Sequence, residues 1–293
     1  KLAEEQEMIR NSVRDFAENV LGPKVADRDE KEYYDREVFL QMAKLGLTGI
    51  PFEPQYGGAG FDYIAYAIAV EELGRVDPSA ADTLSSHVSL GAWPIWKYGN
   101  EEQKNKYLID LVEGTKHGAF GLTEANAGSD AVNMTTKAEL DGNEYVLNGR
   151  KIFITNAEAA DTYVVFARTG PKELKSKAFS AFIVEKGTPG FTFSKFEKKM
   201  GLRGTQNCDL VFENCRIPKA NLLGKEGEGF KIAMATLDGG RIGIAAQSVG
   251  LAQGAFEQAV AYAKQRVQFG KPIAALQGIQ FKLADMALEI KAS

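Results

Sequence analysis

A long segment without proline does most to limit how this chain can fold. From Phe230 to about Arg266 the apolar residues keep the spacing of an α-helix, and a helix of about 35 residues is about 50 Å long. "FGKP" (residues 269–272) interrupts the pattern, and a second helical pattern follows. Its apolar residues, at alternating steps of three and four, are Leu276, Ile279, Leu283, Met286 and Ile290.

We predict two long antiparallel helices here, with apolar faces that need further helices to cover them. The second pattern continues to the last residues without a glycine or proline stop. We therefore interpret residues 1–293 as part of a longer protein. The first residue is lysine, which suggests a trimmed N-terminus.

The region before residue 119 also has helical spacing. One amphipathic helix is predicted around Val13 and Phe16, ending at Leu21–Pro23, and a second around Phe39 and Met42. "YIAYAIAVEEL" is typical of a buried helix and "EEQKNKYLIDLVEG" of a surface helix. We predict an all-helical N-terminal domain over residues 1–118.

From about Ala119 the pattern changes to alternation of β-forming residues, which continues to about Leu223. Two hairpin signals occur, at residues 141–143 and at Asn148–Gly149, and the second is the stronger. We predict a middle β-barrel or sandwich domain over 119–225 and the start of a C-terminal helical bundle over 226–293. The fold class is thus α+β multidomain, with an incomplete bundle.

Composition and missing motifs exclude several functions. The net charge is −4 without blocks of like charge, which argues against a nucleic-acid partner. No apolar run is long enough to span a membrane. The sequence has no Rossmann fingerprint, P-loop, GxSxG or HExxH. Cys208 and Cys215 have no metal-ligand spacing, so we expect them buried in strands and predict no metal site.

Several segments together resemble the acyl-CoA dehydrogenase family, in the family's order and over the whole chain. They are "PFEPQYGGAG", "AFGLTEANAGSD", "LNGRKIFITNA", "GEGFKIAMATLDGGRIGIAAQSVGLAQGAF" and "QRVQFGKPI…QGIQFKLADM". The resemblance is closest to the short-chain, butyryl-CoA branch. It implies an FAD-dependent enzyme that oxidises an acyl-CoA thioester to the trans-2-enoyl-CoA in fatty acid β-oxidation, and passes electrons to an electron-transfer flavoprotein.

The resemblance assigns cofactor contacts to two segments. A flavin needs apolar contact for its ring, hydrogen bonds for its polar edge, and glycine where backbone approaches closely. Ser129 would also contact the CoA portion of the substrate, and Thr155 would hydrogen-bond near the hydride-accepting nitrogen. The family usually has proline where Ala125 stands, so a less rigid loop is expected. The assigned residues are Phe120, Leu122, Thr123, Gly128, Ser129, Phe153, Ile154 and Thr155.

The remaining assignments lie in the helical C-terminal part. By resemblance, Asp238, Gly239, Gly240 and Arg241 contact the substrate. Arg266, Phe269 and Gln277 contact the FAD of a neighbouring subunit, which implies a homo-oligomer, commonly a tetramer.

Each assignment also has an ordinary structural explanation. The first segment could be an Asx or Ser turn, Phe153 a core aromatic residue of a strand, and Asp238–Arg241 a helical ion pair.

The catalytic base is not assigned within residues 1–293. In most of the family it is a glutamate later in the bundle, which here would lie beyond residue 293. A minority branch carries it at the position of Gly240, and glycine cannot remove a proton. Asp238 and Glu257 are the nearest acids, but neither matches a family base position. We therefore expect that residues 1–293 alone cannot turn over substrate.

Two other functions remain open. One is an acyl-CoA oxidase or flavin monooxygenase of the same fold, and the other is a binding module that has lost flavin. A cytoplasmic bacterial location is expected, with the mitochondrial matrix as the alternative.

Overall fold

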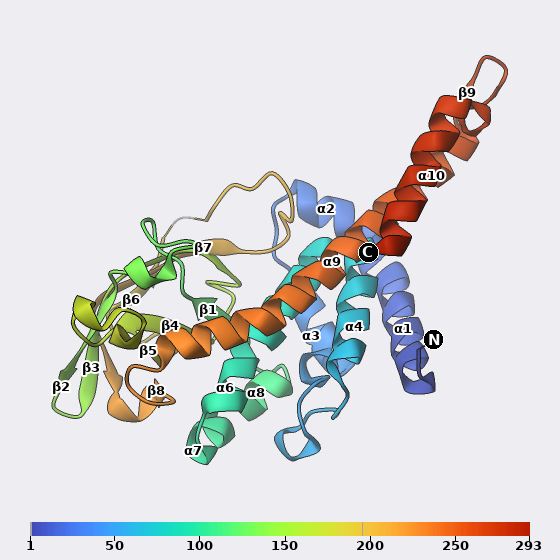
Figure 1. Ribbon diagram of the computed structural model, residues 1–293. Helices are drawn as coiled ribbons and strands as arrows, with labels where there is room; N and C mark the ends of the chain where they lie inside the picture. The colour runs from blue at the N-terminus through green and yellow to red at the C-terminus, as the bar shows by residue number, and fades with distance from the viewer. Residues whose placement is uncertain (1, 195) are drawn as a thin grey trace.

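The computed structural model describes residues 2–194 and 196–293 as a helical N-terminal part, a β domain and a long C-terminal helix pair. In Figure 1 the helix α9 (Gly229–Gln265) runs from the β domain across the helical part, and α10 (Gln277–Ala292) returns beside its far half. The predicted helix–sheet–helix organisation is therefore confirmed.

Eight α-helices occur in the described residues before the first strand. Aspartates begin three of them: Asp35 accepts a hydrogen bond from the amide of Glu37, Asp62 from Ala65, and Asp77 from Ser79 and Ala80. The helices are α1 (Glu4–Phe16), α2 (Val25–Glu30), α3 (Arg36–Lys44), α4 (Tyr63–Val76), α5 (Pro78–Ser85), α6 (Trp93–Tyr98), α7 (Glu101–Gln103) and α8 (Ile109–Val112).

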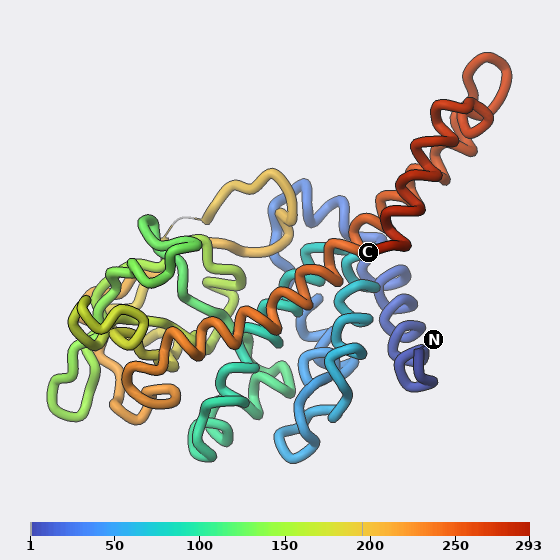
Figure 2. The backbone as a smooth tube through the Cα atoms, viewed as in Figure 1, coloured from blue at the N-terminus to red at the C-terminus, as the bar shows by residue number. Residues whose placement is uncertain are grey.

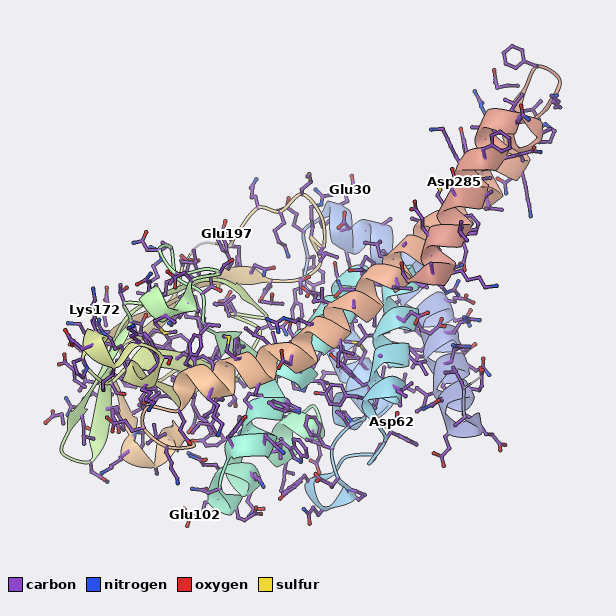
Figure 3. All side chains as sticks on the ribbon, in the orientation of Figure 1. Glu30, Asp62, Glu102, Lys172, Glu197 and Asp285 are labelled. Atoms are coloured by element: carbon purple, nitrogen blue, oxygen red, sulfur yellow. The ribbon has the colours of Figure 1, made fainter. Side chains whose placement is uncertain are left out.

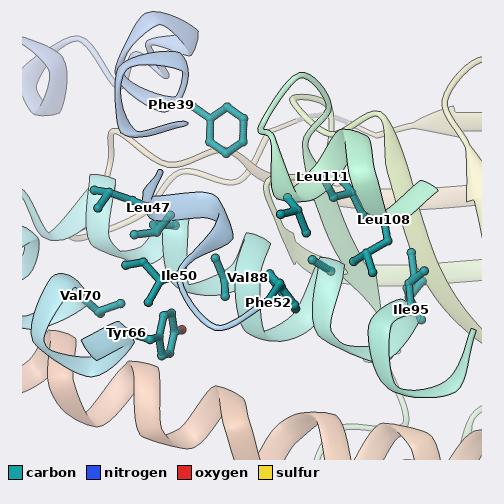
Figure 4. Close-up of a cluster of buried hydrophobic side chains, with 14 of the residues drawn as sticks. Phe39, Leu47, Ile50, Phe52, Tyr66, Val70, Val88, Ile95, Leu108 and Leu111 are labelled. Carbon is teal, nitrogen blue, oxygen red and sulfur yellow. The ribbon is translucent and has the colours of Figure 1, made fainter. Parts of the chain in front are cut away.

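One predicted boundary was wrong. The α1 helix does not stop at Leu21–Pro23 but continues as the π-helical segment η1 (Ala17–Leu21) and a 3-10 turn (Gly22–Lys24) into α2. Proline is tolerated there because it lies at the start of a turn, where its missing N–H has no helical acceptor. Buried side chains such as Phe39, Phe52 and Tyr66 pack between these helices (Figure 4).

The β domain contains the strands β1 to β8, and its sheet runs in the order β6-β7-β3-β2-β4-β5-β8, with β1 paired to β4. Ala119, Leu147, Phe182 and Phe212 from four strands share one core. The strands are β1 (Gly118–Gly121), β2 (Lys137–Asp141), β3 (Glu144–Thr155), β4 (Thr162–Arg168), β5 (Phe179–Glu185), β6 (Phe191–Phe193), β7 (Asn207–Pro218) and β8 (Leu222–Leu223).

The hairpin predicted at Asn148–Gly149 was wrong, whereas the turn at residues 141–143 joins β2 to β3 as predicted. The β3 strand passes straight through Asn148 and Gly149, and its register with β7 shifts between Leu147 and Gly149. Gly149 has a φ of 151°, and a Cβ there would lie 2.4 Å from the hydroxyl of Thr136. The glycine therefore serves a β-bulge and a close approach instead of a turn.

The strands β4 and β5 are apolar on both faces. Tyr163 and Val165 face the core of the β domain, whereas Val164 and Phe166 belong to the core shared with the helices. Two-sided burial explains why "TYVVFAR" is continuously apolar and not alternating. Cys208 and Cys215 are buried in β7, as predicted.

The α9 helix lies directly on α4. A Cβ at Gly250 would be 2.0 Å from the carbonyl oxygen of Glu71, and one at Gly254 would be 2.0 Å from that of Arg75. Only glycine permits this approach. The last turns of α9 and much of α10 extend beyond the helical part, as Figure 2 shows, and Figure 3 shows side chains such as Asp285 projecting from α10. Phe281 and Leu288 on α10 are exposed.

Two buried histidines join the helical part to β1. The Nε2–H of His87 donates to the carbonyl of Leu111, and its Nδ1 accepts the amide N–H of Gly118 at 3.0 Å. His117 stacks on Phe39 with ring centroids 4.1 Å apart. Burial lowers the pKa of His87 to about 4 and that of His117 well below its ordinary value. Both rings are therefore neutral in the folded protein at neutral pH.

We predict that these histidines make the fold sensitive to acid. The unfolded chain takes up a proton on His87 below about pH 6.5, whereas the folded chain resists protonation down to about pH 4. The stability present above pH 6.5 is lost as the pH falls towards 4, by about 3 kcal/mol for His87. Urea unfolding between pH 4 and 7.5 measures the effect. His87→Gln should be less stable at pH 7 and flatter between pH 6.5 and 4; an unchanged slope would contradict the assignment.

Candidate functional site

The structure brings together the two segments that the sequence assigned to a flavin. The first follows β1 and includes Leu122 and Thr123, and the second is the end of β3. The carbonyl of Thr123 accepts a hydrogen bond of 2.8 Å from the amide of Ile152. Thr123 and Thr155 are both half-buried, so each of these residues is partly accessible from the surface of the β domain.

A second β-bulge turns Phe153 outwards. The β3–β7 register shifts between Lys151 and Ile154, and Phe153 has a left-handed φ of 59°, which is uncommon for a bulky residue. Its side chain is 62% exposed, whereas Ile154 is buried in the core of the β domain. Of these two predicted contacts, Phe153 can therefore offer its ring to a ligand and Ile154 only its backbone. The local strain lies where the chain presents an apolar surface.

A buried ion pair lies behind these two segments. The Nζ of Lys151, fully buried, lies 2.7 Å from Oε1 of Glu124 and 3.1 Å from the carbonyl oxygen of Leu122. Glu124 also accepts hydrogen bonds from the amides of Thr135 and Thr136. The carboxylate therefore joins both ends of the loop 125–134 to β3.

The charges of this pair persist at neutral pH. Burial alone would raise the pKa of Glu124, but Lys151 and the threonine donors outweigh it and lower that pKa to about 2. Burial lowers the pKa of Lys151 to about 8, and Glu124 opposes this shift. At pH 7 both groups are therefore ionised, and each supplies the counter-charge of the other.

The loop 125–134 is more exposed to solvent than the strand β1 that precedes it. Gly128 and Ser129 are exposed, and no atom lies within 4 Å of the position of a Cβ on Gly128. Phe120, in contrast, is half-buried and packs on Phe166 with ring centroids 4.9 Å apart. Phe120 and Leu122 thus form a fixed apolar wall, while the residues at 128 and 129 remain accessible to a ligand.

The predicted substrate residues lie on two sides of α9, with Asp238 and Arg241 on the exposed side. Arg241 forms an ion pair with Asp238, as in the ordinary structural explanation, and both side chains are largely exposed. Gly239 and Gly240 face the opposite way, where a Cβ would lie 3.1 Å from the hydroxyl of Tyr63 and 2.9 Å from Leu90 respectively.

A π-helical segment joins α9 to the strand β1. The segment η5 (Ser86–Ala92) packs against both β1 and α9, and Gly91 touches the backbone of Gly118. It therefore holds α9 beside the first of the two segments that the sequence assigned to a flavin.

A charged hollow of about 500 Å³ lies at the beginning of α9. Lys177 and Lys231 supply positive charge, Glu226 and Glu228 supply negative charge, and Phe230 adds an apolar wall. The N-terminus of α9 adds further positive potential. This hollow can hold an anionic group beside a flat or apolar one.

Three predicted residues lie far from the rest of the site. Arg266, Phe269 and Gln277 occur where α9 ends and α10 begins, and Phe269 is 89% exposed. The rise of α9 places Arg266 about 37 Å along the helix from Arg241. Within one chain they cannot contact the same flavin ring as Thr155.

Sequence analysis missed two polar residues behind the segments, the buried Lys151 and the half-buried Asn207. Lys151 directly precedes the apolar residues 152–154 of β3. Its exposed neighbour Arg150 carries the same charge, so the sequence alone does not show which of the two is buried and paired. Nothing in the sequence marks Asn207, whose role depends on contacts with residues far from it in the chain.

A helical part, a β domain and a helix pair around such a site define a flavin-dependent dehydrogenase of the helix–sheet–helix class. The family models "Acyl-CoA dehydrogenase, N-terminal domain", "middle domain" and "C-terminal domain" match residues 3–115, 119–215 and 227–293. The chain belongs to the acyl-CoA dehydrogenase family, whose members are FAD-dependent oxidoreductases.

Close relatives have been described. The chain is 53% identical to an "Acyl-CoA dehydrogenase, short-chain specific" from Megasphaera elsdenii, covering 100% of this chain and 77% of the relative. The solved structure of butyryl-CoA dehydrogenase from the same organism matches with a TM-score of 0.97 and 52% identity, over 100% and 77% of the two chains. A chain in a structure described as an electron transferring flavoprotein of Acidaminococcus fermentans matches with a TM-score of 0.98 and 54% identity, over the same shares.

The residues present fit an FAD. The exposed ring of Phe153 and the wall of Phe120 and Leu122 suit a flat aromatic ring system, and Thr123 and Thr155 suit its polar edge. Within the described ranges, no cluster of three or more His, Cys, Asp or Glu could hold a metal ion.

We predict that the Glu124–Lys151 pair behaves as a unit. Lys151→Met leaves a carboxylate buried without its counter-charge, which costs about 3–5 kcal/mol of folding free energy. Replacing both partners, in Glu124→Gln/Lys151→Met, should recover most of that loss. Urea unfolding of wild type, both single variants and the double variant measures the coupling; strictly additive effects would contradict it.

Proposed function

We propose that this protein catalyses the FAD-dependent α,β-dehydrogenation of short-chain acyl-CoA, such as butyryl-CoA, to the trans-2-enoyl-CoA. The observation that carries the proposal is the meeting of Phe153, Thr123 and Thr155 at one surface, held by a buried ion pair. The names of the close relatives, short-chain acyl-CoA dehydrogenase and butyryl-CoA dehydrogenase, support the substrate class.

In this proposal the residues of the protein position the flavin and the substrate and supply hydrogen bonds to the flavin. The bound flavin provides the acceptor for the β-hydrogen of the substrate. Phe153 and Leu122 hold the ring by apolar contact, and Thr123 and Thr155 hydrogen-bond its polar edge. The α9 helix positions the thioester beside it, with η5 as the fixed support. Preorganised donors of this kind cost no rearrangement during the reaction.

We further propose that a glutamate beyond residue 293 removes the α-proton. The acids of α9 are unsuited to act as the base, because Asp238 pairs with Arg241 and is exposed, and Glu257 pairs with Arg75. A general base must reach the proton in a desolvated site. Gly240 has no side chain and lies against Leu90, so the base position of the minority branch is not used here.

The charged hollow at the beginning of α9 is proposed to hold the nucleotide end of CoA. Lys177 and Lys231 carry charge complementary to its phosphates. From Lys231 to Arg241 the helix rises about 15 Å, a distance that the extended pantetheine arm of CoA can bridge. The thioester would then arrive beside Asp238–Arg241, and Ser129 would border the arm.

An electron-transfer flavoprotein is the proposed electron acceptor, supported by the family and by the description of one matching structure. The separation of Arg266, Phe269 and Gln277 from the ring site supports a homotetramer, in which these residues contact the FAD of a neighbouring subunit. In the part of the chain that the structure describes, no helix is long and apolar enough to cross a bilayer. Bacterial relatives support a cytoplasmic location.

The direct test is substrate bleaching. Full-length protein loaded with FAD and mixed anaerobically with butyryl-CoA should lose its visible flavin absorption, and longer or branched thioesters should do so more slowly. Rapid formation of hydrogen peroxide in air would instead favour an oxidase. A full-length protein that binds no FAD would instead support the alternative of a non-catalytic binding module.

We predict that the hollow recognises the nucleotide and not the acyl group. Lys177→Ala/Lys231→Ala should lower kcat/KM for butyryl-CoA about tenfold, because charge-assisted hydrogen bonds contribute about 1.5–3 kcal/mol. The same variant should change kcat/KM for butyryl-pantetheine, which lacks the nucleotide, less than twofold. Lys219→Ala, an exposed lysine outside the hollow, is the control. Equal losses with both substrates would place the nucleotide elsewhere.

A further inference from the structure

A chain of hydrogen bonds reaches Thr155 from behind the site. The Nδ2 of Asn207 donates to the Oγ1 of Thr155 at 3.1 Å, and the Oδ1 of Asn207 accepts from the Nζ of Lys199 at 2.6 Å. Lys199 also donates to the carbonyl oxygens of Leu202 and Thr205, both at 2.7 Å. The three donors of the ammonium group are thus used, and its position is fixed.

This chain has only one possible direction. An ammonium group can only donate, so the amide of Asn207 must turn its oxygen to Lys199 and its nitrogen to Thr155. The oxygen of Thr155 therefore accepts a hydrogen bond, and its own O–H must point elsewhere. Within the described residues the Thr155 hydroxyl forms no second hydrogen bond.

The geometry is held from two sides. Thr155, the last residue of β3, pairs with Asn207, the first residue of β7. The loop that carries Lys199 is attached to α2, where Arg203 bonds Asp29 through both its backbone and its side chain. Figure 2 shows this loop reaching from the β domain to α2. The hydrogen-bond chain therefore depends on contacts between the β domain and the helical part.

We propose that Asn207, held by Lys199, is a positioning residue that turns the O–H of Thr155 towards the polar edge of the bound flavin. The inference rests on the proposed function, because it requires FAD at the Phe153–Thr155 surface. Asn207 itself does not touch the cofactor; it acts through Thr155. The aimed O–H stabilises the electron density that reduction adds to that edge of the ring.

Asn207→Asp is the sharpest test, because it keeps the size of the side chain and its contact with Lys199. The introduced carboxylate accepts where the amide donated, so the O–H of Thr155 turns to that carboxylate and away from the flavin. Asn207→Leu removes both hydrogen bonds but leaves the O–H free to rotate towards the ring. Asn214→Asp, about 23 Å along the same strand, is the control for the added charge.

The expected order of effects distinguishes a role in orienting the O–H of Thr155 from a role in the stability of the fold. Asn207→Asp should keep the melting temperature, shift the visible spectrum of the oxidised flavin, and lower its reduction potential by about 30 mV, a tenfold change for two electrons. Its rate of flavin reduction by butyryl-CoA should fall about 30-fold. Asn207→Leu should melt several degrees lower but lose less than tenfold in rate. In a Thr155→Val background, Asn207→Asp should add no further shift.

A purely structural role predicts the reverse order, with Asn207→Asp like wild type and Asn207→Leu worse; that result would overturn the inference. The spectrum and the potential need no acyl-CoA, so they also separate this inference from the proposed function. Normal bleaching of wild type with an unchanged Asn207→Asp spectrum would refute the positioning role alone. A shifted Asn207→Asp spectrum without bleaching of wild type by any acyl-CoA would refute only the proposed substrate class. A full-length protein that binds no FAD would refute both the proposed function and the positioning role.

Discussion

The buried pair of Glu124 and Lys151 is the interaction on which the site depends. Two charges in a low-dielectric interior are tolerated because each compensates the other and backbone donors complete the carboxylate. The pair joins segments that are separated in the chain by a loop and a hairpin. It thereby reinforces the backbone hydrogen bond between the carbonyl of Thr123 and the amide of Ile152, next to the bulge at Phe153.

The bulge shows where the fold stores strain. A left-handed Phe153 is unfavourable by itself, yet its neighbours on both sides are fixed: Lys151 by the ion pair and Ile154 by burial in the core. Rigid neighbours hold an apolar ring at the surface, which is what a flat cofactor requires. The helical part contributes by supporting α9 through η5 and by holding the loop that carries Lys199.

The sequence predicted the elements well wherever one pattern persisted. The helices α4, α9 and α10 and the strands β4, β5 and β7 follow directly from spacing and continuous apolar character. The sequence-based prediction was wrong at Asn148–Gly149. There the glycine belongs to a β-bulge inside β3, where Thr136 leaves no room for a Cβ, and not to a hairpin turn. The prediction was also wrong at Pro23, where a tight turn carries the chain from one helix into the next.

What the sequence by itself determined is the order of the helical and β domains and, by resemblance, the family; the residues that contact a flavin remain its prediction. Local periodicity and motif chemistry are properties of neighbouring residues, so they can be read from the chain. Only the tertiary structure decided which polar groups stand behind those residues. Lys151 meets Glu124, and Lys199 reaches Thr155 through Asn207, because strands and loops that are distant in sequence come into hydrogen-bond range only when the β domain folds.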